Sequence, residues 1–394
     1  MNAEQRYIQK RIWKARFQSI PFYLFRIFPV QKKKIVFCCI EGTTGYTCNP
    51  KYIAGELIRR RSDIQLVWLA DDVSKIFPKE IRVVQNTLWN RAFHLTTARL
   101  WIDNSRKQLE VRKRKGQIYI QTWHAKLGFK PTCLDRGASF SRIAYLVSRH
   151  DSDMIDYVLS NSKWYDDSLP TGMIYEGPVL RTGSPRCDIL VHDRTERKMQ
   201  IRDRYGLPQD AKILMYAPTF RGGSQGTDRT ITAEQRFPDY GRLVHALEQR
   251  FDGRWYIFLR LHPQLVARNL DKRMENGSVI DVSRVDDLYE LLAGCDAFLT
   301  DYSSAAFDAA VMRVPVFLYA DDYAEYEGER GKLLWDLREL PFPLAQNDGE
   351  LEEQIERFDE ERYLDRLELL FRETEMVEDG NAAGRVADVI EEMM

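Results

Sequence analysis

Two series of short apolar runs, each interrupted by helix-length segments, constrain the fold of this 394-residue chain more than any other feature. Such runs are rich in Val, Ile, Leu and Tyr, which is typical of strands buried on both faces of a parallel sheet. The first series is 34–40, 64–70, 81–84, 100–103, 117–122 and 157–160, and the second is 211–217, 255–261, 278–282, 297–300 and 314–319. The sequence therefore predicts an α/β protein with two doubly wound domains that face each other across a cleft.

Composition shifts suggest where these domains begin and end. A polar stretch at 191–209 interrupts the rhythm and predicts a linker. We therefore expect a basic N-terminal segment at 1–33, a first domain at 34–190, a second domain at 210–345 and acidic helices at 346–394. The helical spacing of apolar residues in the last segment predicts helices that pack on the outside and that can cross back to the first domain.

The net charge of −1, from 58 Lys and Arg against 59 Asp and Glu, is a cancellation between two ends of opposite sign. Residues 1–34 carry nine basic residues against one acid, and residues 348–394 carry seventeen acids against five arginines. The near-neutral total argues against a protein that coats nucleic acid. Six cysteines without a CxxC pair predict buried, reduced thiols in a cytosolic protein.

Segment 9–33 interleaves cations with apolar and aromatic residues, and this mixture suits a helix lying in a membrane interface. Anionic lipid attracts such a segment by about 1 kcal/mol per cation. The alternative is an ordinary helix with a solvated basic face, but aromatic residues are more frequent here than such a helix requires. No run approaches the roughly 18 apolar residues of a membrane span, and no secretory leader is visible. We expect a protein inside the cell, on the membrane surface.

Two loops of the first series are candidates for chemistry, because ligands bind at the carboxyl ends of parallel strands. Segment 41–52 is a Gly/Thr loop in which Asn49 could cap a helix, with Lys51 beside it, but it fits neither a dinucleotide fingerprint nor a P-loop. In segment 121–130, a strand leads directly into His124, with Lys126 and Lys130 following. A histidine at this place can take a proton from an attacking hydroxyl, although a structural histidine is an equal alternative.

Two loops of the second series carry groups suited to phosphate. Arg221 follows one strand, and Arg260 and His262 follow the next, so we expect them on one rim. Segment 299–308 turns a strand into a helix that starts with Ser303 and Ser304, after Asp301. This arrangement offers hydroxyl and backbone N–H groups to a diphosphate, whereas a plain double-serine cap is the alternative.

The order and wording of these loops resemble the CDP-glycerol glycerophosphotransferase family, the bacterial enzymes that build wall teichoic acid and related capsule polymers. The matching runs are GYTCNPKYIAGELIRR (45–60), YIQTWHAKLGFK (119–130), VLSNSKW (158–164), GSPRCDIL (183–190), ILMYAPTFRG (213–222), RLHP (260–263) and VDDLYELLAGCDAFLTDYSSAAFDAA (285–310). The resemblance implies a GT-B-type pair of Rossmann-like domains, with an acceptor domain first and a CDP-donor domain second. It also implies a lipid-linked saccharide acceptor at the inner membrane face.

The resemblance gives roles to individual residues. His124 matches the acid/base histidine, His262 the histidine at the phosphates, and Ser303 and Ser304 the serines that hold the donor diphosphate. The other donor-side residues are then Arg221, Arg260, Asp301 and Arg330, and the acceptor-side residues are Asn49, Lys51, Lys126 and Lys130. The family usually has Gly-Thr-Pro-Leu-Lys after the histidine, whereas this chain has AKLGFK (125–130), which indicates a rebuilt acceptor loop.

The predicted reaction is transfer of glycerol phosphate from CDP-glycerol to a hydroxyl of a membrane-bound saccharide lipid, with release of CMP and without a metal or cofactor. The chain lacks the long extra N-terminal region of many polymerising members, which favours a short primase-like or single-addition enzyme or a capsule-type relative. An oligomer is compatible with the sequence. Three alternatives stay open. A ribitol-phosphate transferase would use CDP-ribitol, a GT-B glycosyltransferase would bind a UDP- or GDP-sugar in place of CDP, and a non-enzymatic membrane scaffold would tolerate loss of both serines.

Overall fold

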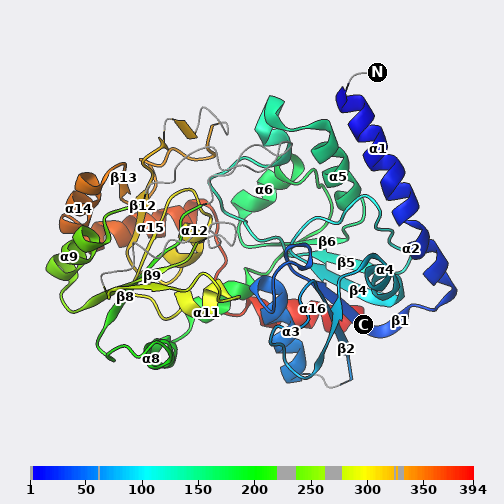
Figure 1. Cartoon of the computed structure of the whole chain (residues 1–394), viewed down its shortest axis with the longest axis horizontal. Coiled ribbons are helices and arrows are strands. Elements are labelled where there is room, and N and C mark those ends of the chain that lie inside the picture. Colours follow the sequence, from blue (N-terminus) through cyan, green and yellow to red (C-terminus); the bar gives the residue numbers. More distant parts are fainter. Residues whose placement is uncertain (1–2, 61–62, 220–236, 262–276, 324, 327–331) are drawn as a thin grey trace.

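Two parallel sheets form the two lobes of the molecule in the computed structural model (Figure 1), which describes residues 3–60, 63–219, 237–261, 277–323, 325–326 and 332–394. The strand order is β3-β2-β1-β4-β5-β6-β7 in the first sheet and β10-β9-β8-β11-β12-β13 in the second. Both sheets thus begin with the order 3-2-1-4-5-6 of a doubly wound Rossmann domain. The predicted fold class, two Rossmann-like domains in a GT-B-like arrangement, is confirmed.

The first sheet is buried on both faces. Alternate residues of its central strand belong to two apolar clusters, Val36 and Cys38 to one and Ile35 and Phe37 to the other. Helix α4 covers the first face, and α3 covers the second. The strands are β1 (Gln31–Cys38), β2 (Gln65–Ala70), β3 (Ile81–Gln85), β4 (Ala98–Asp103), β5 (Ile118–Gln121), β6 (Tyr157–Ser160) and β7 (Val179–Arg181), and the main helices are α3 (Cys48–Arg60), α4 (Leu88–Thr97), α5 (Arg142–Ser152) and α6 (Lys163–Gly172).

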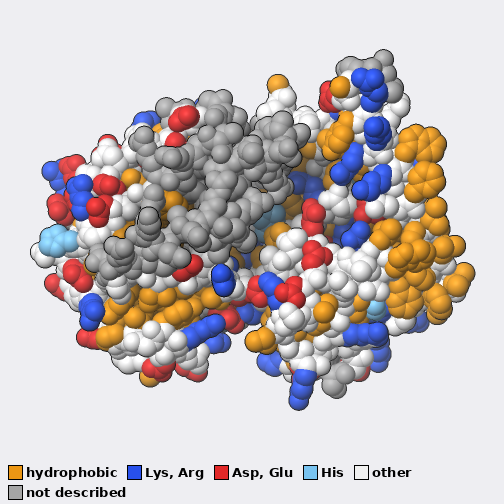
Figure 2. All heavy atoms as spheres, viewed as in Figure 1, with side chains coloured by type: hydrophobic (Ala, Val, Ile, Leu, Met, Phe, Trp, Pro, Cys, Tyr) orange, Lys and Arg blue, Asp and Glu red, His pale blue; other side chains and the backbone are white. Residues whose placement is uncertain are grey.

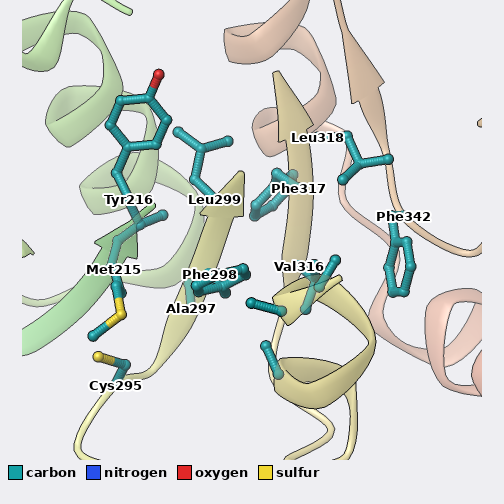
Figure 3. Close-up of a cluster of buried hydrophobic side chains, with 14 of the residues drawn as sticks. Met215, Tyr216, Cys295, Ala297, Phe298, Leu299, Val316, Phe317, Leu318 and Phe342 are labelled. Carbon is teal, nitrogen blue, oxygen red and sulfur yellow. The ribbon is translucent and has the colours of Figure 1, made fainter. Parts of the chain in front are cut away.

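The second sheet has a core rich in aromatic side chains. Phe298 and Phe317 lie on neighbouring strands with Leu299, Val316 and Leu318 around them (Figure 3). The strands are β8 (Lys212–Tyr216), β9 (Trp255–Leu259), β10 (Val279–Asp281), β11 (Ala297–Thr300), β12 (Val316–Tyr319) and β13 (Leu344–Ala345), and the helices include α8 (Thr195–Arg204), α9 (Tyr240–Phe251), α11 (Leu288–Leu292), α12 (Ala305–Ala310), α14 (Asp348–Glu356) and α15 (Glu360–Glu373).

The C-terminal helices divide between the two domains. Helix α14 packs against α9 of the second domain. Helix α16 (Ala382–Met393) returns to the first domain and packs against α3, as the red helix in Figure 1 shows. Its Val386, Ala387 and Ile390 are part of the first domain's core. The Asp188 carboxylate accepts the N–H groups of Ala382 and Ala383 at 2.9 and 2.7 Å, which fixes the start of this helix.

The N-terminal segment contains α1 (Ala3–Gln18), α2 (Ile20–Leu24) and a short 3-10 turn at Phe25–Ile27. In α1 the one buried side chain is that of Ala15, whereas Phe22 of α2 is fully buried against α4. Among the residues that the structure describes, no helix is long and apolar enough to cross a membrane. The six cysteines are all buried free thiols.

Several elements differ from the sequence-based expectations. Strand β1 starts at Gln31, before the expected boundary at 33/34, because a register irregularity between Gln31 and Ile35 lets the chain pair with β4 earlier. The expected linker at 191–209 contains α8, whose Ile201 packs in the second domain's core. Strands β7 and β13 were not expected, since three and two residues are too short to form a recognisable apolar run.

Candidate active site

The carboxyl ends of the two sheets meet where the domains touch, and the candidate residues lie on loops at these ends. In the first domain the loop after β5 carries His124 beside the loop after β4. In the second domain the loop after β11 carries Ser303 and Ser304 beside the loop after β8. The strand order reverses between β1 and β4 in the first sheet and between β8 and β11 in the second, and open α/β sheets bind ligands at such points. Ser303 and Ser304 follow β11 at this point, whereas His124 follows β5, one strand away from it.

His124 is exposed at the cleft and has a fixed ring orientation. Its Nδ1 lies 2.8 Å from the carbonyl oxygen of Asn104, an acceptor, so Nδ1 carries the proton and Nε2 is the basic nitrogen. Protein surrounding the cleft withdraws water from the ring and lowers its pKa, more than the Asn104 carbonyl raises it. His124 is therefore suited to act as a base near neutral pH.

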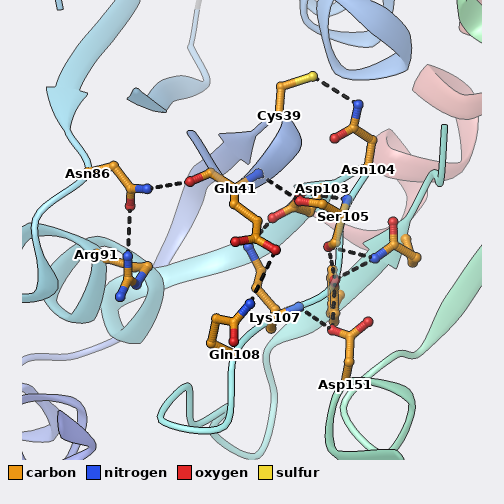
Figure 4. Close-up of polar contacts among 12 residues, drawn as sticks. Cys39, Glu41, Asn86, Arg91, Asp103, Asn104, Ser105, Lys107, Gln108 and Asp151 are labelled. Atoms are coloured by element: carbon orange, nitrogen blue, oxygen red, sulfur yellow. Dashed lines mark hydrogen bonds and ion pairs between the residues drawn. The ribbon is translucent and has the colours of Figure 1, made fainter. Parts of the chain in front are cut away.

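A buried polar network holds Asn104 in place (Figure 4). The Asn104 side chain accepts the N–H of Ile40 at 2.7 Å and donates to the Cys39 sulfur at 2.9 Å. Ser105 next to it accepts the N–H of Glu41 at 2.9 Å. Deeper in the sheet, Asp103 forms a buried ion pair with Lys107. The loop that orients His124 is thus tied to the end of β1.

Arg186 connects the His124 segment with the second domain. Its guanidinium donates to the His124 carbonyl oxygen at 2.6 Å and to the Asp308 carboxylate of α12 at 2.9 Å, and it is 2% exposed. Asp308 also accepts the Tyr289 hydroxyl at 2.7 Å. Loss of one member of such a pair leaves an uncompensated buried charge, which costs about 3–5 kcal/mol. The sequence analysis missed this role, although Arg186 lies in the GSPRCDIL run.

The donor-side turn after β11 is fixed from within. Both Asp301 oxygens accept the N–H of Thr219 at 2.9 Å, which joins this turn to the end of β8. Ser303 and Ser304 are half-buried, and Ser303 accepts the N–H of Ala305 at 3.3 Å. A Cβ placed on Gly128 would lie 3.5 Å from the Ser304 Cβ. The backbone just beyond His124 therefore lies directly against the serine turn of the other domain.

The family model of CDP-Glycerol:Poly(glycerophosphate) glycerophosphotransferase matches residues 20–392. The chain belongs to this family. The resemblance seen in the sequence is confirmed, and the chain is a CDP-glycerol glycerophosphotransferase family member.

Known relatives of this glycerophosphotransferase act in teichoic acid synthesis. It is 29% identical over 371 residues to the teichoic acid glycerol-phosphate transferase of Staphylococcus aureus, covering 91% of this chain and 93% of the relative. It is 26% identical over 385 residues to a poly(glycerol phosphate) polymerase of Staphylococcus epidermidis, covering 92% of this chain but about half, 51%, of that protein. A solved structure of the wall teichoic acid polymerase TagF superposes with a TM-score of 0.81 at 24% identity, covering 100% of this chain and 98% of that one, which shows the fold.

Two predicted residues of the glycerophosphotransferase bind protein groups. The Arg260 guanidinium donates to the carbonyl oxygens of Val285 at 2.7 Å and Asp286 at 3.3 Å, so it holds the loop before α11. Lys51 bridges the domains, 2.5 Å from Asp287 and 2.6 Å from Glu290. Burial raises the pKa of Asp287, and the Lys51 ammonium opposes this rise. Lys51 thus lies in the domain interface, whereas Arg260 stabilises a loop within the second domain.

Three predicted acceptor-side residues of the glycerophosphotransferase are likewise placed by the structure. Asn49 lies inside the first turn of α3 rather than capping it, because the helix starts at Cys48. Its buried amide donates to the Trp123 carbonyl at 2.9 Å and accepts the Arg186 N–H at 3.1 Å. Lys126 is buried, and its ammonium donates to the Gly183 carbonyl at 2.9 Å; burial lowers its pKa. Lys130 reaches the second domain.

The remaining predicted residues of the glycerophosphotransferase, Arg221, His262 and Arg330, lie outside the described residues. The described site thus brings together His124, Asn104 and Arg186 on one side and Asp301, Ser303 and Ser304 on the other.

Proposed function

We propose that this family member transfers glycerol phosphate from CDP-glycerol to a hydroxyl of a membrane-bound saccharide lipid and releases CMP. The acceptor oxygen attacks the phosphorus that bears glycerol, and the bond from this phosphorus to the bridging oxygen of the diphosphate breaks. His124 Nε2 takes the proton of the attacking hydroxyl, and CMP leaves with the electron pair. Positioning and electrostatic stabilisation supply most of the rate in such transfers.

One observation carries this proposal. The backbone at Gly128 lies against Ser304, so the segment that bears the base touches the turn proposed to hold the diphosphate. The Asn104 carbonyl fixes the imidazole tautomer, which leaves Nε2 for the acceptor hydroxyl. Ser303 and Ser304 offer hydroxyl groups to the phosphate oxygens from the opposite side. Family resemblance also assigns Arg221 and His262 to the donor phosphates, and both lie outside the described residues.

A donor screen tests the proposal. The purified protein is incubated with a lipid-linked disaccharide and with CDP-glycerol, CDP-ribitol, a UDP-sugar or a GDP-sugar, and the released nucleotide is measured. We expect CMP from CDP-glycerol. A ribitol-phosphate primase of Bacillus spizizenii is 29% identical over 316 residues, so CDP-ribitol is the alternative donor. Release of UDP or GDP in place of CMP would overturn the phosphotransfer assignment.

The acceptor is tested separately by product length. We propose a single addition, as in a primase, and mass spectrometry of the lipid product should then show one added glycerol phosphate at excess donor. A ladder of longer products would identify a polymerase instead.

We also propose that the N-terminal segment places this site at the inner membrane surface. Figure 2 shows a large hydrophobic area over α1 and α2. We define the apolar patch as the exposed residues here and on neighbouring α4: Trp13, Phe17, Ile20, Tyr23, Leu24, Ile27, Phe28 and Trp89, exposed by 42–82%. Arg16 lies over Trp13 and Arg26 over Tyr23, with guanidinium-to-ring distances of 5.1 and 4.6 Å. Aromatic residues paired with cations suit an anionic lipid interface.

Vesicle flotation tests the patch. Replacing Trp13, Phe17 and Ile27 with Ser should abolish binding to anionic vesicles and leave CDP-glycerol binding intact. Ile76→Ser is the matched control, because Ile76 is 92% exposed on another surface. Deleting residues 1–30 is a poorer test, since it also removes the buried Phe22. Unchanged vesicle binding of the triple variant would rule out the patch as the anchor.

A further inference from the structure

The segment after His124 belongs to the first domain in sequence but is anchored in the second domain. Leu127 and Phe129 are buried in the second domain's core, and the Phe129 ring lies 4.9 Å from that of Phe307. The Phe129 carbonyl accepts the N–H of Leu334 at 2.8 Å. The indole of Trp335 donates to the Gly128 carbonyl at 3.2 Å. Burial of the apolar Phe129 ring in the second domain stabilises this contact.

This anchoring carries Lys130 to the donor side of the cleft. The Lys130 ammonium lies 3.4 Å from the Thr219 hydroxyl and 5.9 Å from the centre of the Tyr326 ring. The N–H of Thr219 is bound by Asp301, and Tyr326 stacks on Tyr302 with ring centres 3.8 Å apart. Both neighbours of Lys130 are thus joined to the Asp301–Tyr302 stretch, which leads directly into Ser303 and Ser304.

Chain length places the ammonium within reach of the serine turn. Gly128 contacts Ser304, as described above, and Lys130 follows two residues later. Two residues span at most about 7 Å, and the flexible lysine side chain can cover much of that distance. The ammonium can therefore reach the serine hydroxyls.

The charge of the Lys130 ammonium suits the binding of a diphosphate at this place. The buried Asp301 carboxylate lies beside the serine turn and would repel a diphosphate. The Lys130 cation lies at Thr219, whose N–H group Asp301 binds, and it offsets that repulsion. A lysine ammonium binds phosphate as a compact point charge, and its charge-assisted hydrogen bonds are about twice as strong as neutral ones.

We propose that Lys130 is a donor-side ligand, contributed by the first domain, that binds phosphate oxygens of the CDP-linked donor. This inference rests on the proposed function for the identity of the nucleotide. It replaces the acceptor-side role that the sequence suggested for Lys130.

Titration of the full chain with CDP-glycerol in the absence of acceptor tests the proposal. Lys130→Met should raise the Kd about 10- to 100-fold, and Lys130→Arg should recover most of the affinity. In turnover assays KM for CDP-glycerol should rise more than KM for the acceptor lipid. The matched control is Lys115→Met, since Lys115 is exposed just before β5, at the amino end of that strand and away from the site.

A purely structural role makes a different prediction. Lys130→Gln keeps a hydrogen-bond donor for the Thr219 hydroxyl but removes the positive charge. If the role of Lys130 is structural, this variant should bind CDP-glycerol with the wild-type Kd. A wild-type Kd of Lys130→Gln, whatever the Kd of Lys130→Met, or an effect confined to the acceptor KM, would overturn the proposal. If the wild-type protein binds a UDP- or GDP-sugar and no CDP-glycerol, the proposed function fails, and the same variants test Lys130 with that nucleotide.

Discussion

The fourth strand in the order 3-2-1-4 ends in a similar way in both sheets, and the two loops can be compared directly. Strand β4 leads into Asp103, Asn104 and Ser105, and β11 leads into Asp301, Tyr302 and Ser303. In each loop a side chain accepts an N–H group from the loop after the first strand. Asn104 accepts that of Ile40 at 2.7 Å, and Asp301 accepts that of Thr219 at 2.9 Å.

The loops differ in what they leave for a ligand. In the first domain Asp103, Ser105 and Lys107 fill the space with buried contacts to one another and to the backbone. In the second domain Ser303 and Ser304 stay half-exposed. The same topological position therefore supports a base on the neighbouring strand in one sheet and presents hydroxyl groups in the other. A shared fold position does not imply a shared role.

The strongest test of this difference removes the base. His124→Ala should lower kcat for CMP release by about 10²- to 10⁴-fold, the usual contribution of a general base, and leave the Kd for CDP-glycerol unchanged. His245→Ala is the control, because His245 lies exposed on α9. Near-normal turnover of His124→Ala would show that the first domain's loop does not hold the base.

Two variants should distinguish the roles of the loops after β4 and β11. Ser303→Ala with Ser304→Ala should raise the Kd for CDP-glycerol about 10²- to 10⁴-fold, because hydrogen bonds to charged groups contribute about 1.5–3 kcal/mol each. Asn104→Ala should leave this Kd unchanged and lower kcat about 10-fold, since the carbonyl that orients His124 loses its side-chain anchors. Calorimetry and steady-state kinetics on both variants measure the two effects. Equal effects of both variants on Kd and kcat would remove the distinction.

The smallest expected effect is on the pH profile. The His124 pKa is lowered, so kcat/KM should fall only below pH 6.5, as the imidazole gains a proton that blocks its basic nitrogen. The same lowered pKa favours the neutral ring in the folded state, so this group's contribution to stability is lost as pH falls below its unfolded value. An acidic limb of kcat/KM centred above pH 6.5 would contradict the assignment. Measurement between pH 5 and 8 with saturating acceptor covers this range.

The sequence predicted most of the fold, because strands buried on both faces carry unmistakable apolar runs. It missed β7 and β13, and it missed α8, whose polar surface resembles a linker while Ile201 is buried. These three elements are short or mostly exposed. Tertiary contacts define them, and no local sequence pattern reveals them.

The candidate site was predicted less completely. The positions of His124, Ser303 and Ser304 at strand ends followed from the rhythm of the chain. The direction of a side chain did not, so Asn49 and Arg260 turn toward backbone groups. Lys130 lies beside Thr219 of the second domain because its neighbour Phe129 packs in the core of that domain. Arg186 binds both domains through partners 62 and 122 residues away in the chain, which no local motif encodes.

The position of α16 at the end of the chain has a consequence for folding during translation. Translation delivers all the strands of the first sheet and α3 before the second domain, but α16, which completes the cover over the face of Ile35 and Phe37, is synthesised after it. The nascent first lobe therefore exposes part of this apolar face while the second lobe emerges and folds, a state that is prone to aggregation. The lobe that is made first is the lobe that is completed last.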